Sequence, residues 1–154
     1  MKTLLITAFI AISGLSFGQI QRVERPKTER IGEVRPFGKF CIESTRDGNR
    51  YTFTYRDRKL RHIGDYKHFS FEDVDGAFDR LYEMIMDGFS KKHKKGEQST
   101  MLEIPVGYLW LNFRTNLGIT RFSFGHGLGK NGYVLGFSPW LTKKQVIKLF
   151  GKEK

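Results

Sequence analysis

The chain has 154 residues, of which 27 are Lys or Arg and 16 are Asp or Glu, so its formal net charge is +11. The length suits one domain with a substantial core, and the single cysteine, Cys41, excludes an intramolecular disulfide. A positive charge of this size favours anionic partners, such as nucleic acid, acidic polysaccharide or a phosphate-bearing cell surface, but says nothing about the fold.

Residues 1–18, MKTLLITAFIAISGLSFG, have the pattern of a cleavable secretory signal peptide. Lys2 precedes an apolar run, and the small residues Ser16 and Gly18 follow it at the spacing that a signal peptidase requires. We therefore expect cleavage before Gln19 and an exported protein, either secreted or periplasmic. A membrane anchor is the alternative, but the run is shorter than the ~20 residues that span a bilayer. No membrane span is expected once the signal is removed.

Residues 19–36 combine mixed charges, two prolines and few apolar side chains, so we expect a flexible charged arm. A single α+β domain over residues 37–154 should follow. At its start, residues 39–44 and 51–56 alternate apolar and polar side chains. Asp47-Gly48 between them is a strong turn signal, and the pattern predicts a β-hairpin.

Ser70–Phe89 carries the clearest helical pattern, which predicts one long amphipathic helix. Ser70 is the expected N-cap, with Asp73 at the capping-box position. The apolar side chains recur at the helical period and comprise Phe71, Val74, Ala77, Phe78, Leu81, Tyr82, Ile85 and Phe89. The opposite face is acidic, so this stretch stands out in a chain that is otherwise strongly basic.

The remaining chain predicts further strands and a short helix. Met101–Ile104 precedes a break at Pro105, and strand patterns at residues 108–114, 120–124 and 133–137 predict an antiparallel meander. Thr142 and Gln145 form a capping box for a helix over residues 143–150. The order ββαβββα describes an α+β domain, with one antiparallel sheet of about five strands, the long helix across a face and a short C-terminal helix.

A glycine-rich segment, GHGLGKNG, occupies residues 125–132. Gly127-x-Gly129-x-x-Gly132 matches the dinucleotide-binding pattern, but a strand rather than a helix follows it, so we interpret the segment as a hairpin loop. The alternative is a loop that contacts an anion through its backbone N–H groups and Lys130.

Three residues are the catalytic candidates of the sequence: His126, His68 and Cys41. A Cys–His nucleophilic pair stays open, since such partners meet in space rather than in sequence. His62 and His68, with Asp65 between them, lack a recognised metal-ligand spacing. We expect neither a metal nor a cofactor, and Cys41 is interpreted as a packing residue in a strand.

Two kinds of charged surface are candidates for binding, and for each the plain alternative is a solvated face. Basic side chains form the anion-binding candidates, which are Arg56, Arg58, Arg61, Lys91, Lys92, Lys94, Lys95 and Lys130. Tyr108 and Trp110 are candidates for stacking on bases or sugars. The acidic helix face supplies candidates for contact with a basic protein, namely Asp75, Asp79, Glu83 and Asp87.

These patterns lead to two hypotheses of function. The first is a small, basic, non-catalytic exported binding or interaction protein, whose partner is an anionic polymer, a cell-surface component or a basic protein. The second is a small secreted hydrolase with a histidine-based site at His126 or His68. A cleft that joins His126 to a carboxylate or a thiol would favour the enzyme.

Overall fold

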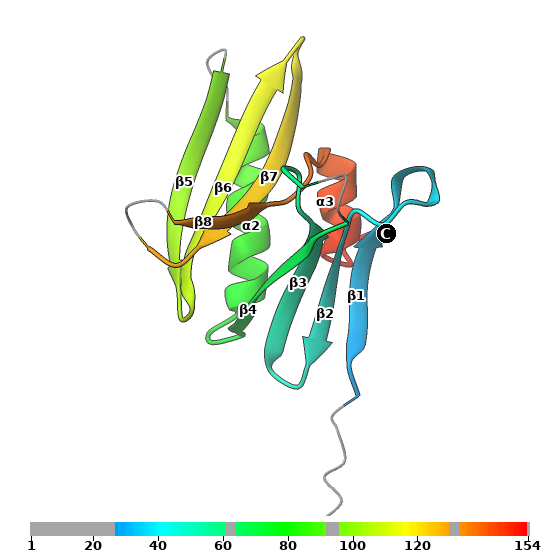
Figure 1. Ribbon diagram of the computed structural model, residues 1–154, viewed down its shortest axis with the longest axis vertical. Helices are drawn as coiled ribbons and strands as arrows, with labels where there is room; N and C mark the ends of the chain where they lie inside the picture. Colours follow the sequence, from blue (N-terminus) through cyan, green and yellow to red (C-terminus); the bar gives the residue numbers. More distant parts are fainter. Residues whose placement is uncertain (1–26, 61–63, 92–95, 130–132, 154) are drawn as a thin grey trace, which may run out of the picture.

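The computed structural model describes residues 27–60, 64–91, 96–129 and 133–153, so the predicted signal peptide lies outside the described residues. The described part forms two antiparallel sheets and two α-helices (Figure 1). The elements in chain order are β1 (Glu29–Val34), the 3-10 helix η1 (Pro36–Gly38), β2 (Ile42–Asp47), β3 (Arg50–Arg56), β4 (Tyr66–Glu72), α2 (Ala77–Ser90), β5 (Gly96–Ile104), β6 (Gly107–Asn116), β7 (Ile119–Gly127), β8 (Val134–Phe137) and α3 (Lys143–Leu149).

The strands form two sheets, each of four strands in sequence order. Sheet A contains β1 to β4 and sheet B contains β5 to β8. The prediction of a single α+β domain is confirmed, whereas the prediction of one sheet with about five strands is wrong. Each strand pairs with its neighbours in the chain, and α2 separates the two series, so the strands before and after it build separate sheets.

Residues 29–34 of the expected arm form strand β1 at the edge of sheet A, whereas residues 19–26 of that arm lie outside the described residues. Val34 is buried and lies opposite Ile42 of β2. Helix α3 packs on this edge so closely that a Cβ at Gly32 would overlap the carbonyl of Leu149. The apolar residues in this stretch are few, but α3, which comes from the other end of the chain, covers them.

Helix α2 begins later than predicted, since Ser70 lies in β4 opposite Thr52. Gly76, with a φ of 72°, sets the N-terminal boundary, and the Oδ1 atom of Asp73 accepts a hydrogen bond of 2.9 Å from the backbone N–H of Phe78. The predicted Ser70 cap is therefore wrong. Apolar residues at the start of the stretch fit a strand as well as a helix, and pairing with β3 decided between the two.

The later part of the predicted helix is confirmed, with Phe78, Leu81 and Ile85 buried. Figure 1 shows α2 running across one face of sheet B. The core joins both sheets and both helices around Phe53 of β3, whose ring centroid lies 5.3 Å from that of Phe124 in β7 and 5.4 Å from that of Phe150 after α3.

Local signals at the hairpin and at the last helix are also confirmed. In the β2–β3 hairpin, Asp47 pairs with Arg50 across a turn in which Gly48 has a φ of 58°. At α3, Thr142 and Gln145 form the reciprocal capping box through bonds of 3.3 and 2.8 Å. In the described residues, no helix is long and apolar enough to cross a membrane.

Candidate functional site on the outer face of sheet B

We call the face of sheet B that points away from α2 the outer face. The alternation of buried and exposed side chains along β6 shows which residues lie on it. Leu109, Leu111 and Phe113 are buried on the α2 side. Side chains alternate between the two faces of a strand, so Trp110 and Arg114 point the other way. The outer face therefore carries the polar and aromatic residues of the same strand.

Two arginines lie directly opposite each other on the outer face. Arg114 of β6 pairs with Arg121 of β7, and both side chains are exposed. Within the described residues, neither arginine forms an ion pair. Like charges at directly opposed positions destabilise a sheet. Folding does not need this arrangement, which makes it a candidate for binding.

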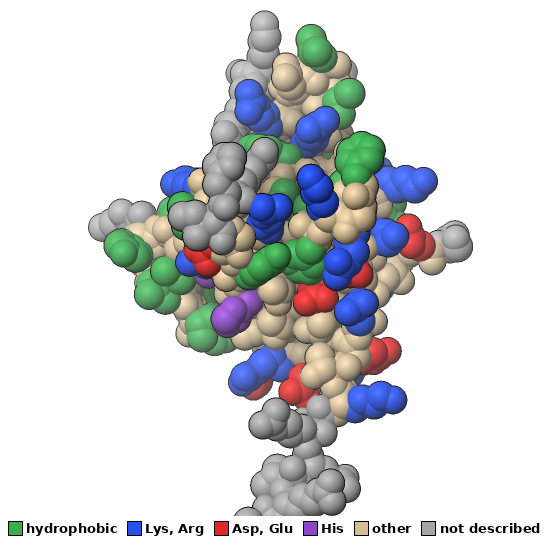
Figure 2. Space-filling model, turned by 45° about the vertical axis from the view of Figure 1, so that its right-hand side comes forward, with side chains coloured by type: hydrophobic (Ala, Val, Ile, Leu, Met, Phe, Trp, Pro, Cys, Tyr) green, Lys and Arg blue, Asp and Glu red, His purple; other side chains and the backbone are tan. Residues whose placement is uncertain are grey.

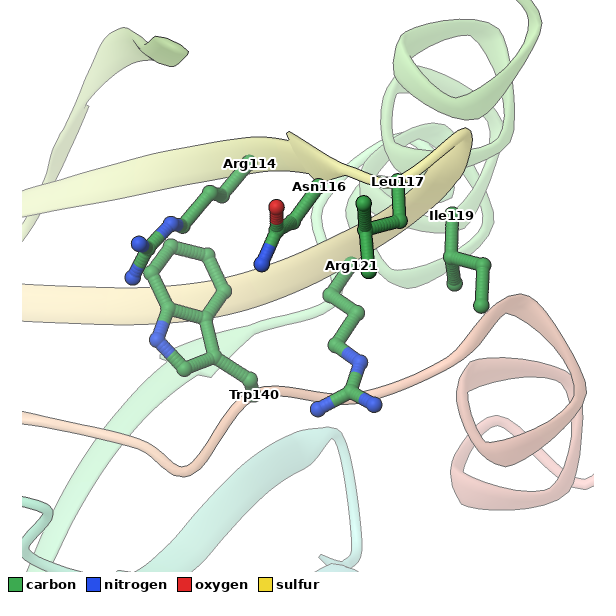
Figure 3. A pocket seen from close by; sticks show the side chains of 6 residues that line it. All are labelled: Arg114, Asn116, Leu117, Ile119, Arg121 and Trp140. Carbon is green, nitrogen blue, oxygen red and sulfur yellow. The ribbon is translucent and has the colours of Figure 1, made fainter.

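A pocket of about 240 Å³ opens beside these arginines (Figure 3). We call it the sheet B pocket, and its lining consists of Arg114, Asn116, Leu117, Ile119, Arg121 and Trp140. Figure 3 shows Arg114 of β6 and Arg121 of β7 pointing to the side on which Trp140 lies. The lining contains two cations and no carboxylate.

Trp140 reaches the pocket because the chain bulges as it passes β7. Ser138 donates its backbone N–H to the carbonyl of Phe124 at 2.8 Å, and Leu141 donates to the carbonyl of Phe122 at 2.7 Å. Two residues, Pro139 and Trp140, therefore lie opposite a single residue of β7, which is the pattern of a β-bulge. Such a bulge redirects a side chain, and here it brings the indole ring beside the arginines.

Arg58, which follows β3 of sheet A, completes the site from the opposite sheet. Its backbone N–H donates to the carbonyl of Phe137 at 2.9 Å. Its guanidinium carbon lies 4.7 Å from the ring centroid of Trp140 and 5.3 Å from that of Phe137. Cation–π contacts at these distances contribute about 0.5–2 kcal/mol and hold the guanidinium in a defined orientation.

This arrangement suits the binding of an anionic group. Guanidinium groups are planar, stay charged at every accessible pH, and bind carboxylate, sulfate or phosphate oxygens through paired N–H donors. Asn116 adds an amide to the lining. Arg58 is held by its contacts with Trp140 and Phe137, which lowers the entropic cost of binding through this group.

The structure places the basic candidates of the sequence in different surroundings. Arg58 is brought to the site just described, whereas Arg56 lines a second pocket with it. Lys91, at the end of α2, forms an ion pair of 2.6 Å with Asp87. The remaining basic candidates lie outside the described residues; they are Arg61, Lys92, Lys94, Lys95 and Lys130.

Sequence reasoning missed three residues of the site: Arg114, Arg121 and Trp140. A signal existed for the arginine pair, because the two-residue turn at Leu117-Gly118 sets the register of the β6–β7 hairpin and places them opposite each other. No local signal existed for Trp140, since its position depends on how the segment after β8 crosses β7.

His126 is buried, and its Nδ1 atom forms a hydrogen bond with the hydroxyl of Tyr55. Burial lowers the pKa of His126, with His68 and Lys67 acting in the same direction and Asp57 opposing them. Burial also raises the pKa of Tyr55. These two residues join β3 of sheet A to β7 of sheet B. Neither side chain lines the sheet B pocket.

The two other catalytic candidates lie in different surroundings. His68 is exposed on β4, opposite Thr54. Cys41 is buried just before β2 and accepts a backbone hydrogen bond of 3.1 Å from Arg56. The glycine-rich segment begins inside β7, and its residues 130–132 lie outside the described part. His62, the other residue considered for a metal site, is also outside it.

The acidic candidates for protein contact are exposed, and two of them are paired within the chain. Asp79 binds Lys152 at 2.8 Å, and Asp87 binds Lys91 at 2.6 Å. Glu83 is exposed on α2, while Asp75 precedes the helix with a φ of 53°. This acidic face therefore already has cationic partners at both ends of the helix.

Comparison with known proteins gave no relative. No protein-family model, curated protein or solved structure matches this chain significantly. Function must therefore be argued from the site itself.

Proposed function

We propose that this chain is a non-catalytic binding protein for an anionic polymer, with the acidic groups of the polymer held in the sheet B pocket. The observation that carries the proposal is the exposed pair Arg114 and Arg121, opposed across two strands and without ion pairs in the described residues. Arg58, held over Trp140, adds a third guanidinium at the margin of the pocket.

An anion in this pocket would relieve the repulsion between the two arginines. Relief of this repulsion would contribute to the affinity for the ligand, because binding replaces a like-charge contact with charge-assisted hydrogen bonds. The net charge, which is +11 for the whole chain and +10 once the expected cleavage removes Lys2, adds long-range attraction for a polyanion. The expected export places the protein where acidic polymers of the cell surface are accessible.

A histidine-based hydrolase is the second candidate, and the contact between Tyr55 and His126 is the observation in its favour. A general base must come within hydrogen-bond reach of its substrate. His126 is 7% exposed and Tyr55 is fully buried. Their burial suits a contact that joins the two sheets better than a base that must reach a substrate. The geometry therefore supports binding better than hydrolysis.

The test compares two double variants that lose the same charge. Arg114→Gln with Arg121→Gln removes the site pair, and Arg46→Gln with Arg50→Gln removes two exposed arginines from the β2–β3 hairpin, which Figure 1 shows at the opposite end of the molecule from the β6–β7 hairpin. Heparin is the probe, and its binding is measured over a salt series. We expect only the site variant to bind weakly, with a salt slope lower by about 1–2.

Equal losses in the two double variants would show that heparin responds to net charge alone and would overturn the proposal. Unchanged binding of the site variant would do the same. Thermal unfolding of each variant provides the control for folding. The four arginines are exposed, so we expect each double variant to remain folded.

A further inference from the structure

A second pocket, also of about 240 Å³, lies on the sheet A side, and we call it the sheet A pocket. Its lining consists of Pro36, Lys39, Phe40, Cys41, Arg56, Asp57, Arg58 and Pro139. Three of these side chains are cationic and one is a carboxylate. Asp57 is buried, and its Oδ1 atom accepts the backbone N–H of Lys59 at 2.9 Å, so part of its hydrogen-bonding capacity is already used.

The two pockets adjoin across the bulge of the chain. Pro139 lines the sheet A pocket, and the next residue, Trp140, lines the sheet B pocket. Arg58 lines the sheet A pocket and lies over the ring of Trp140. Lys and Arg side chains are frequent over the upper half of the face in Figure 2, with few acidic ones between them. The two pockets therefore adjoin at the Pro139–Trp140 bulge, and both are lined by cationic side chains.

The aromatic ring in each pocket already holds an arginine. Arg58 lies 4.7 Å from the ring centroid of Trp140, and Arg35 lies 5.4 Å from that of Phe40. Proteins that bind single-stranded nucleic acid leave aromatic faces open for the bases to stack on. Here the rings orient guanidinium groups instead, which favours a ligand recognised by its acidic groups and not by flat bases.

We propose that a single chain of an acidic polysaccharide occupies both pockets at once, with successive sulfate or carboxylate groups held by Arg114 and Arg121 in one pocket and by Lys39 and Arg56 in the other. This inference rests on the proposed function and deepens it by naming the polymer class and the path of the polymer. Two linked subsites raise the affinity for a long chain, because the second contact becomes intramolecular after the first has formed.

The test uses heparin oligosaccharides of increasing length, titrated against the unmodified protein and two double variants. In the unmodified protein, affinity should rise by about tenfold or more once an oligosaccharide is long enough to reach both pockets. Lys39→Gln with Arg56→Gln should abolish this rise in affinity. The affinity of that variant for the shortest binding oligosaccharide should equal the affinity of the unmodified protein. Arg114→Gln with Arg121→Gln should weaken binding at every length.

The outcomes separate the two proposals. One outcome is that the variant of Arg114 and Arg121 loses all binding while oligosaccharide length has no effect in any protein. This outcome would support the sheet B pocket as a binding site and would overturn the two-pocket path. Absence of binding by every protein would overturn both proposals. Tighter binding of single-stranded DNA than of a heparin oligosaccharide of matched charge would overturn the choice of polysaccharide. Lys39→Gln alone serves as a second variant, since Lys39 is exposed and its replacement should not affect folding.

Discussion

Replacing Gly88 with alanine should destabilise this protein, although the same change stabilises most helices. Gly88 is buried in α2 where the helix crosses sheet B. A Cβ at this position would overlap three atoms of the Phe113 ring. Even the farthest of the three, Cε1, would lie only 2.7 Å from it. Phe89 and Phe122 pack against the ring on two sides, with their ring centroids 5.6 and 5.2 Å from its own, while a space of about 160 Å³ borders it elsewhere.

The two opposing energies decide the sign. Alanine is favoured over glycine inside a helix by about 0.8–1 kcal/mol. Excess volume in a packed core costs about 1–3 kcal/mol, and a contact this short belongs in the upper part of that range. We therefore expect Gly88→Ala to lower the free energy of unfolding by about 1–2 kcal/mol. Urea denaturation followed by circular dichroism measures this difference directly.

A second background isolates the contact. In Phe113→Leu the ring is gone, so Gly88→Ala should there raise the free energy of unfolding by its helix propensity. The four proteins make a double-mutant cycle, and its coupling energy reports the overlap between Gly88 and Phe113. Stabilisation by Gly88→Ala in the otherwise unmodified protein would refute the packing of α2 on sheet B described above.

Two further predictions test the joint between the sheets and the edge strand. Burial lowers the pKa of His126 below its ordinary value of 6.5, so the unfolded chain binds more protons than the folded one as the pH falls through that value. Stability should therefore decline as the pH falls below about 6.5, and His126→Gln should flatten the decline. Gly32→Ala should cost about 3 kcal/mol, because the added methyl group meets the backbone carbonyls of Lys148 and Leu149, which cannot turn aside. A denaturation midpoint equal to that of the unmodified protein would show that β1 does not pack on α3.

The sequence by itself determined the features that depend on residues close together in the chain. The Asp47-Gly48 turn sets the register of one hairpin, and Thr142 with Gln145 caps α3 across three residues. The buried face of α2 was predicted from its period because a helix places residues three and four apart on one side. Each of these features forms from local geometry, so no distant partner was needed to predict it.

Tertiary structure decided where elements begin and which of them meet. Ser70 joined β4 because β3 offered a strand to pair with, and residues 29–34 became a strand because β2 and α3 cover them. The candidate site depends on the same long-range packing. Arg58 meets Trp140 only because the two sheets face each other and the chain bulges beside β7. Hydrophobic burial, which is not directional, sets such contacts, and no spacing within the sequence records them.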